Sequence, residues 1–214
     1  MSSLPSVYQS VIALSRYARY LPEENRRETW EETVDRMVNY LKSKNKGLDK
    51  EFKEIREAVL NLEIMPSMRL MMSAGEACDR DNISAYNCSY LAMNNKRAFS
   101  EALYILMNGT GVGFSCERQE ISKLPSIPET ISHCDDVIVV GDSKLGWAKA
   151  FKKLLSSLWE GDIPTIDYSH VRPAGARLKT FGGRASGPEP LKRLFDFVVD
   201  TFKNAQGRKL SSIE

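Results

Sequence analysis

Thiols are the side chains through which this sequence could most readily do chemistry. The 214-residue chain has four cysteines and two histidines, at Cys78, Cys88, Cys116, Cys134, His133 and His170. No two of the cysteines form a Cys-x-x-Cys pair, so the closely spaced ligand pairs of a structural zinc site are missing and we expect no metal site. Four cysteines are also too few to staple a secreted domain of this length. We therefore expect reduced thiols, and any functional one would act by redox or nucleophilic chemistry.

Cys88 is the cysteine with the most suggestive surroundings. It lies in Tyr86-Asn-Cys-Ser-Tyr-Leu91, where a loop enters a predicted strand. A single cysteine is most often a small buried apolar residue. These residues alone leave both possibilities open, a buried apolar cysteine or an active thiol.

The glycine-rich segment Asn108-Gly-Thr-Gly-Val-Gly-Phe114 suggests a nucleotide site but does not fit the dinucleotide fingerprint. Gly-x-Gly-x-x-Gly would need a glycine at position 114, where Phe114 stands. The segment also runs from a predicted helix into a predicted strand, which is the reverse of the phosphate-binding order. The pattern favours a helix end that turns tightly into a strand. Close approach of a ligand to the glycine backbone is compatible with that interpretation.

Residues 171–188 form a basic stretch with four glycines and no acidic residue. It carries Arg172, Arg177, Lys179 and Arg184, and a solvated surface loop is its simplest interpretation. Guanidinium groups on a loop also suit the oxygens of a triphosphate. Aromatic residues at regular spacing are missing, so polymeric nucleic acid is a less favoured ligand than a nucleotide. Asp142-Ser143 is either a helix cap or, through its acid, an acceptor for a ribose hydroxyl.

The periodicity of the chain predicts alternating helices and strands that would position these residues. Thr29-Trp-Glu-Glu32 is a capping box before a helix, and Asp49 is predicted to cap a second helix. Residues 65–93 lack helical periodicity. Further helices are predicted over 100–107, from Ser143, and over 190–203. A buried strand or extended segment is predicted over 137–140, and a strand over 163–168. This order predicts an α/β fold with a parallel sheet.

Composition excludes several classes of protein. Lys plus Arg number 30 and Asp plus Glu number 28, for a net charge of +2, which is far from the one-signed charge of chromatin-type proteins. The 42% of apolar residues is ordinary for a globular protein and excludes disorder. The sequence has no apolar run of the roughly 20 residues that a membrane span needs, and Gln9 and Ser10 interrupt the apolar stretch near the amino terminus. We expect a soluble, cytoplasmic protein.

Several motifs along the chain stand in an order that points to a known family. The motifs are Tyr17-Ala-Arg-Tyr-Leu-Pro22, Arg27-Glu-Thr-Trp-Glu-Glu-Thr33, Met65-Pro-Ser67, Asn87-Cys88, Gly109-Thr-Gly-Val-Gly-Phe114, Asp142-Ser-Lys-Leu-Gly-Trp147 and Arg172-Pro-Ala-Gly-Ala176 with Phe181-Gly-Gly-Arg-Ala-Ser-Gly-Pro188. The last pair is the most specific. In this order they resemble the large catalytic chain of ribonucleotide reductases, most strongly the amino-terminal part of the adenosylcobalamin-dependent class II ribonucleoside-triphosphate reductases.

The resemblance implies a fold and a set of site residues. An amino-terminal helical region would cover residues 1–64, and the first half of a ten-stranded α/β barrel would cover 65–214, with an effector-binding helix and a specificity loop. Cys88 would be one member of the cysteine pair that reduces the ribose 2′ carbon and becomes a disulfide. The substrate-binding residues would be Ser67, Asn87 and Gly111, and the effector-binding residues would be Asp142, Ser143, Arg172 and Lys179.

The resemblance also implies cofactor and partners. These are adenosylcobalamin (at a site mostly outside this chain), a ribonucleotide substrate, a deoxynucleotide or ATP effector and a thioredoxin-like reductant. The family's radical cysteine and the partner of Cys88 would lie beyond position 214, so we expect a carboxy-terminal reductase chain to complete the barrel. Only 121–141 stands where monomeric relatives carry a long insertion, so a homodimer contact is also expected. A class I-like reductase chain and a non-catalytic protein that binds an effector nucleotide remain as alternatives.

Overall fold

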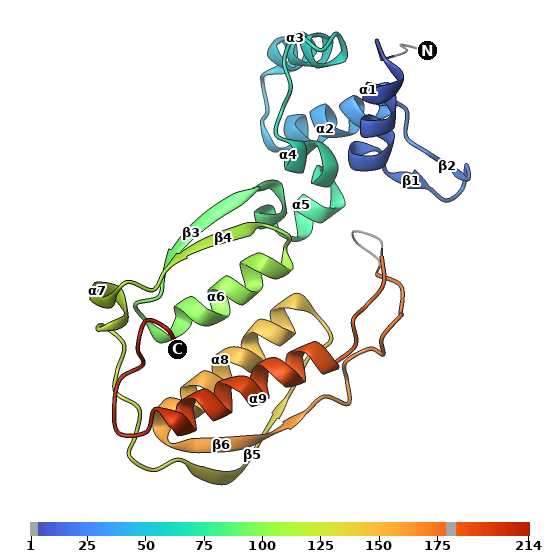
Figure 1. Ribbon diagram of the computed structural model, residues 1–214. Coiled ribbons are helices and arrows are strands. Elements are labelled where there is room, and N and C mark those ends of the chain that lie inside the picture. Colours follow the sequence, from blue (N-terminus) through green and yellow to red (C-terminus); the bar gives the residue numbers. More distant parts are fainter. Residues whose placement is uncertain (1–3, 179–182) are drawn as a thin grey trace. The chain divides into compact units, whose positions relative to one another are not determined.

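The protein consists of two compact units. The computed structural model describes residues 4–178 and 183–214, and its units are Met1–Asn87 and Cys88–Glu214 (Figure 1). Each unit has its own cluster of buried apolar residues. Each is therefore described by itself.

The first unit is built almost entirely of helices. Its elements are α1 (Val7–Ile12), the π-helical turn η1 (Ala13–Tyr17), the antiparallel strands β1 (Tyr20–Leu21) and β2 (Arg26–Arg27), α2 (Trp30–Lys44), α3 (Asp49–Leu60), α4 (Met68–Ser73), α5 (Glu76–Arg80) and the 3-10 turn η2 (Asn82–Ala85). The capping box predicted at Thr29 is present, because the Thr29 side chain accepts from the backbone N–H of Glu32 while the Glu32 carboxylate accepts from that of Thr29. The second predicted cap is wrong: Leu48 occupies the N-cap of α3, and Asp49 is its first residue.

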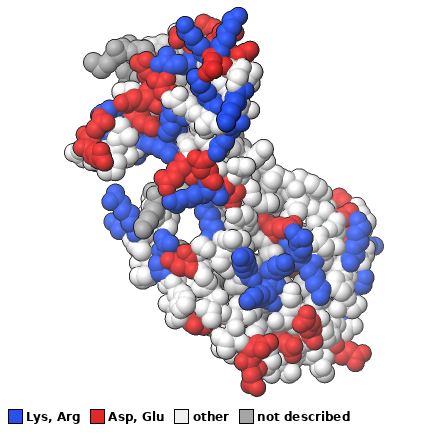
Figure 2. Space-filling view, turned by 180° about the vertical axis from the view of Figure 1, so that it is seen from behind, with Lys and Arg blue, Asp and Glu red and all other residues white. Residues whose placement is uncertain are grey.

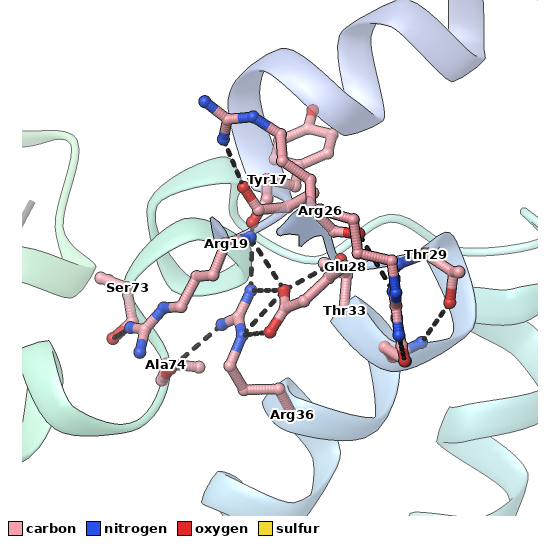
Figure 3. A network of polar contacts seen from close by, with 12 residues as sticks. Tyr17, Arg19, Arg26, Glu28, Thr29, Thr33, Arg36, Ser73 and Ala74 are labelled. Atoms are coloured by element: carbon pink, nitrogen blue, oxygen red, sulfur yellow. Dashed lines mark hydrogen bonds and ion pairs between the residues drawn. The ribbon is translucent and has the colours of Figure 1, made fainter. Parts of the chain in front are cut away.

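Lysines, arginines and acids are interspersed on the surface of the first unit (Figure 2), but one carboxylate is buried inside it. Glu28 is 6% exposed and accepts three hydrogen bonds from the Arg36 guanidinium, the shortest of which is 2.8 Å from Nε to Oε1. Arg36 also donates to the backbone carbonyls of Tyr17 and Ala74, each at 3.0 Å (Figure 3). Every charge in this network therefore has a partner, which offsets the cost of removing it from water.

The segment predicted to lack helices folds as part of the first unit. Residues 65–86 form α4, α5 and η2, and Met71 and Ala74 from this segment are fully buried beside Val34 and Met37 of α2. Helices of four to six residues are too short to show an apolar period in the sequence. The compact units therefore divide between Asn87 and Cys88, later than the domain boundary predicted at 64/65.

The second unit contains two parallel strand pairs, each connected through a helix. Its elements are β3 (Cys88–Ala92), α6 (Lys96–Met107), β4 (Gly111–Ser115), α7 (Arg118–Ile121), β5 (Ser132–Val139), α8 (Lys144–Glu160), β6 (Asp162–Asp167) and α9 (Glu189–Asn204). β3 pairs with β4 and β5 with β6, both in parallel. The predicted α/β class and parallel pairing are confirmed, although within the described residues the strands form two separate pairs and not one sheet.

Helices α6, α8 and α9 pack together between the two strand pairs of the second unit (Figure 1). α8 supplies the centre of the core through Leu154 and Leu158, which are fully buried. Phe195 of α9 stacks on Phe151 of α8 with ring centroids 5.7 Å apart, and Trp159 meets Phe202 edge-on at 4.8 Å. The predicted helices from Ser143 and over 190–203 are confirmed with these buried faces.

Two other predictions for this unit need correction. α6 begins at Lys96, earlier than the predicted residue 100, because Asn95 caps it by accepting from the backbone N–H groups of Arg97 and Ala98. The strand predicted as buried over 137–140 is buried on one face only. Ile138 and Val140 are buried, whereas Val137 and Val139 are 58% and 50% exposed, as expected when side chains alternate along a strand.

Candidate functional site

Cys88 and Gly111 lie directly opposite each other on neighbouring strands. They are the first residues of β3 and β4 and form the first residue pair of the parallel register. The Ser89 hydroxyl donates to the Gly111 carbonyl oxygen at 3.2 Å, which fixes the two strand ends together. Two residues chosen from separate motifs are thus brought side by side by strand pairing.

Cys88 is also the most accessible thiol of the chain. All four cysteines are in the described part, and Cys88 is exposed, while Cys116 and Cys134 are half-buried and Cys78 is buried. The buried Cys78 thiol contacts the Ser73 and Ser84 hydroxyls, as expected for a residue that packs inside the unit. The interpretation of Cys88 as a buried apolar residue is therefore wrong, and its redox role stays a prediction.

Ser67 and Asn87, the other predicted substrate-binding residues, belong to the first unit. Ser67 is exposed at the N-cap of α4, where its backbone carbonyl accepts from the N–H of Met71 at 2.9 Å and its side chain makes no capping bond. Asn87 is exposed immediately before Cys88. Both residues are exposed, and their substrate role stays a prediction.

The glycine-rich segment is a helix end that turns into a strand, as its pattern favoured. α6 ends at Met107 with Asn108 as C-cap, and Gly109 adopts φ +79° with its N–H bonded to the carbonyl of Leu106. This left-handed conformation favours glycine. Asn108 and Thr110 are each 2% exposed, so these two residues of the turn are buried in the unit. Gly111, which follows them, is exposed.

The amino-terminal end of α8 is a tight turn built on two glycines. Ser143 caps the helix by accepting from the N–H of Gly146 at 2.9 Å. Gly146 packs against the backbone of Gly141 so closely that an added Cβ would lie 2.4 Å from the Gly141 oxygen. The capping interpretation of Ser143 is confirmed, and the turn has little freedom to move relative to the helix.

Asp142 and Arg172, two predicted effector-binding residues, form an ion pair with each other. Arg172 Nε lies 3.0 and 2.9 Å from the two carboxylate oxygens of Asp142, and the Arg172 backbone N–H donates to the same carboxylate at 3.2 Å. Hydrogen bonding from the Arg172 side chain lowers the pKa of Asp142 below its ordinary value. Both side chains are about one third exposed, so the pair is partly open to solvent. Lys179, the fourth predicted effector residue, lies outside the described residues.

The basic stretch after Arg172 folds back on itself. Arg177 and Arg184 form an isolated antiparallel bridge, and the backbone N–H of Ala185 donates to the carbonyl of Ala176 at 2.8 Å. The Arg184 guanidinium donates to the Gly175 carbonyl at 2.9 Å. The described part of this stretch is a narrow turn whose exposed Arg177 faces solvent.

A contact that sequence reasoning missed joins the start of α8 to the glycine-rich turn after α6. Lys144, the first residue of α8, donates from Nζ to the Asn108 side-chain oxygen at 2.9 Å. A lysine in the first turn of a helix lies at the positive end of the helix dipole, where cations are disfavoured. The unfavourable position of Lys144 was the signal available in the sequence. The sequence could not identify its hydrogen-bond partner Asn108, which is 36 residues away.

The second unit also has a shallow surface hollow of about 450 Å³ beside α8. It is lined by Lys149, Lys152 and Lys153, two serines of the same helix, and residues 136–138 of β5.

Among the described residues no group of three or more His, Cys, Asp and Glu side chains could hold a metal ion. Within the same residues, no helix has the length and apolar character to span a membrane.

Comparison with known proteins gives one consistent result. Adenosylcobalamin-dependent ribonucleoside-triphosphate reductases of Lactobacillus helveticus and Lactobacillus leichmannii are 27% and 28% identical to this chain, over 92% of its length. A crystal structure of a B12-dependent (class II) ribonucleotide reductase superimposes with a TM-score of 0.81 at 25% identity and covers 95% of the chain. A scan against models of protein families found no match. The resemblance predicted from the motifs is confirmed.

The match covers only part of the relatives. The chain spans 36% of the length of the two reductases and 38% of the crystallised chain. The alignment to the Lactobacillus helveticus protein is 270 positions long, while 92% of this chain is about 197 residues, so about 70 positions have no counterpart here. A shortened segment at 121–141 stays the sequence-based prediction for where much of this difference lies.

Proposed function

We propose that this chain forms the amino-terminal part of a class II, adenosylcobalamin-dependent ribonucleotide reductase, which converts ribonucleotides to deoxyribonucleotides. Its two strand pairs would form part of a ten-stranded α/β barrel. Because the relatives are almost three times as long, the complete activity would require a carboxy-terminal reductase chain or segment. The chain itself would contribute one redox thiol, a substrate loop and an effector loop.

The exposed thiol of Cys88 opposite Gly111 is the observation that carries this proposal. Replacing the ribose 2′ hydroxyl by hydrogen requires two electrons and two protons, and the oxygen leaves as water. Two thiols supply both on forming a disulfide. Cys88 would be one of them, its partner would come from the carboxy-terminal part, and a thioredoxin-like dithiol would restore the pair. Gly111 would let the backbone approach the substrate closely.

The remaining predicted residues would bind nucleotides. Ser67 and Asn87, both exposed, would contact the substrate's phosphates and ribose. Asp142, Ser143 and Arg172, together with Lys179, would bind a deoxynucleotide or ATP effector, for which a carboxylate offers a ribose acceptor and a guanidinium offers a phosphate donor. A homodimer contact at this effector site is part of the proposal.

The hollow beside α8 does not fit adenosylcobalamin. Its volume of about 450 Å³ is that of a site for a drug-sized ligand, and adenosylcobalamin is much larger. We therefore place the cofactor mostly on the part of the reductase that this chain does not match. The residues of this chain supply thiol chemistry and nucleotide recognition only.

Substitution of the cysteines tests the redox assignment. The chain is combined with its carboxy-terminal complement, adenosylcobalamin, a dithiol and each ribonucleoside triphosphate, and formation of deoxynucleotide is measured. Cys88→Ser should abolish multiple turnovers while substrate binding persists, because a hydroxyl cannot form a disulfide. Cys116→Ser and Cys134→Ser are the matched controls and should retain turnover. Loss of turnover in a control, with Cys88→Ser active, would show that another thiol reduces the ribose.

Arg172→Ala tests the effector assignment in the same assembly. If the loop relays the identity of the effector, this variant should change which base each effector favours more than it lowers the best rate. Equal losses for every substrate and effector pair would make Arg172 a simple phosphate contact. Dependence on a separate metalloprotein in place of adenosylcobalamin would identify a class I-like reductase. Nucleotide binding without turnover in any assembly would leave an effector-binding protein.

A further inference from the structure

We propose that Lys144 is a positioning residue that couples the Asp142–Arg172 contact to the turn that presents Gly111. The inference rests on the proposed function, because it gives the effector loop and the substrate loop a physical connection. Lys144 itself would contact neither nucleotide. Its role would be to make the position of Asn108 depend on the position of the turn before α8.

The Asn108 end of this connection is buried and fully oriented. The Asn108 side chain, 2% exposed, accepts from Lys144 Nζ at 2.9 Å and donates from Nδ2 to the Tyr104 carbonyl at 3.0 Å. The buried amide therefore bonds through both its oxygen and its nitrogen. Only Gly109 and Thr110 separate Asn108 from Gly111; the Gly109 N–H is bonded to the Leu106 carbonyl and Thr110 is 2% exposed. Because this short turn is bonded and buried, we expect a displacement of Asn108 to move the start of β4, opposite Cys88.

The other end of the connection is equally constrained. Asp142 stands two residues before Lys144 and holds Arg172 through both carboxylate oxygens. Between them, Ser143 caps α8, and Gly146 contacts the backbone of Gly141 without room for a Cβ. Because packed turns of this kind change between discrete arrangements and do not deform gradually, a shift of Asp142 must carry Lys144 with it.

The type of residue at position 144 supports a role beyond helix stability. The first turn of α8 has no acidic residue, and a lysine there opposes the helix dipole. Its contact with Asn108 offsets that disadvantage. Lys149, farther along α8, lines the open hollow and provides a matched lysine on the same helix.

A double-mutant cycle on the 214-residue chain tests the coupling without any nucleotide. Amide hydrogen exchange at residues 109–113 is measured for wild type, Arg172→Ala, Lys144→Met and the double variant. Arg172→Ala should speed exchange in this turn at least about fivefold, the lower end of typical couplings between sites. In the Lys144→Met background its further effect should be within about twofold, the range of independent substitutions. Lys149→Met should leave the response to Arg172→Ala intact, and Lys144→Arg, which keeps a donor, should restore it.

Two results would overturn the inference. One is a response to Arg172→Ala of less than twofold in wild type, and the other is a response of equal size with and without Lys144. Because this cycle measures hydrogen exchange and not reductase activity, a failure of the coupling can be distinguished from a failure of the proposed function. In the complete reductase, Lys144→Met should weaken the change in base preference caused by dATP, dGTP, dTTP or dCTP without changing the affinity for that nucleotide. A parallel loss of affinity would make Lys144 a nucleotide contact and refute the positioning role.

Discussion

Gly146→Ala would place a methyl group where the backbone of the preceding turn already lies. A Cβ at position 146 would be 2.4 Å from the Gly141 oxygen, 2.7 Å from its carbonyl carbon and 2.8 Å from its Cα. All three are main-chain atoms, so no side-chain rotation can relieve the overlap. The turn that carries Asp142 must move away from α8, and the bond from the Gly146 N–H to Ser143 Oγ must lengthen or break.

The expected magnitude follows from three opposing contributions. Alanine would stabilise a helix interior by about 1 kcal/mol relative to glycine. Overpacking against fixed atoms costs about 1–3 kcal/mol, and loss of a serine cap costs a further 1 kcal/mol or so. We expect the free energy of unfolding of the second unit to fall by about 1–3 kcal/mol, with a melting temperature lower by roughly 4 °C for each kcal/mol.

Urea denaturation followed by tryptophan fluorescence measures this change, because Trp147 and Trp159 lie in the second unit. Gly113→Ala is the matched control. Its Cβ would meet nothing nearer than the Ser89 oxygen at 3.7 Å, so the stability should stay equal or rise by up to about 1 kcal/mol. A Gly146→Ala protein as stable as wild type would refute the reasoning from close packing.

Three further predictions concern the ionised and thiol groups. The lowered pKa of Asp142 means that its ion pair with Arg172 contributes stability above about pH 3.9, its unfolded value, and loses it as the pH falls through the folded pKa. Because both groups are partly exposed, Asp142→Asn should cost only about 0.2–1 kcal/mol at pH 7, and urea denaturation across pH 2–7 should show the cost vanishing at the acid end. Glu28→Ala leaves the Arg36 guanidinium without its buried partner, so thermal unfolding of the first unit should show a loss of about 3–5 kcal/mol, and an unchanged transition would contradict a paired network. Iodoacetamide should label Cys88 before the other three cysteines in the native protein, and peptide mass spectrometry would detect equal labelling if its exposure were no greater than theirs.

Local signals in the sequence were sufficient for much of the fold. The capping box at Thr29 and the Ser143 cap each depend on residues three apart, and both appear in the structure as predicted. The short helices over 65–86 escaped prediction because a helix of one or two turns has no period to detect. For β5, the apolar run over 137–140 hid the alternation that exposes Val137 and Val139.

The geometry of the candidate site required the structure. Sequence motifs identified Cys88 and Gly111 separately, but only the strand register shows that they face each other. The Asp142–Arg172 pair spans 30 residues and the Lys144–Asn108 contact spans 36. Contacts between such distant residues depend on how helices pack, and one sequence contains no local pattern that reports them.

The buried contacts of Arg36 have a consequence for synthesis on the ribosome. The guanidinium joins the carbonyls of Tyr17 and Ala74, and the second of these residues is made long after the first. A nascent chain that has not yet extended to Ala74 therefore holds an arginine and a glutamate whose enclosure is incomplete. Domains fold as units during translation, so the first unit reaches its final state only when α4 has emerged. The order of translation thus makes the emergence of Ala74, directly after α4, the step that completes the partners of Arg36.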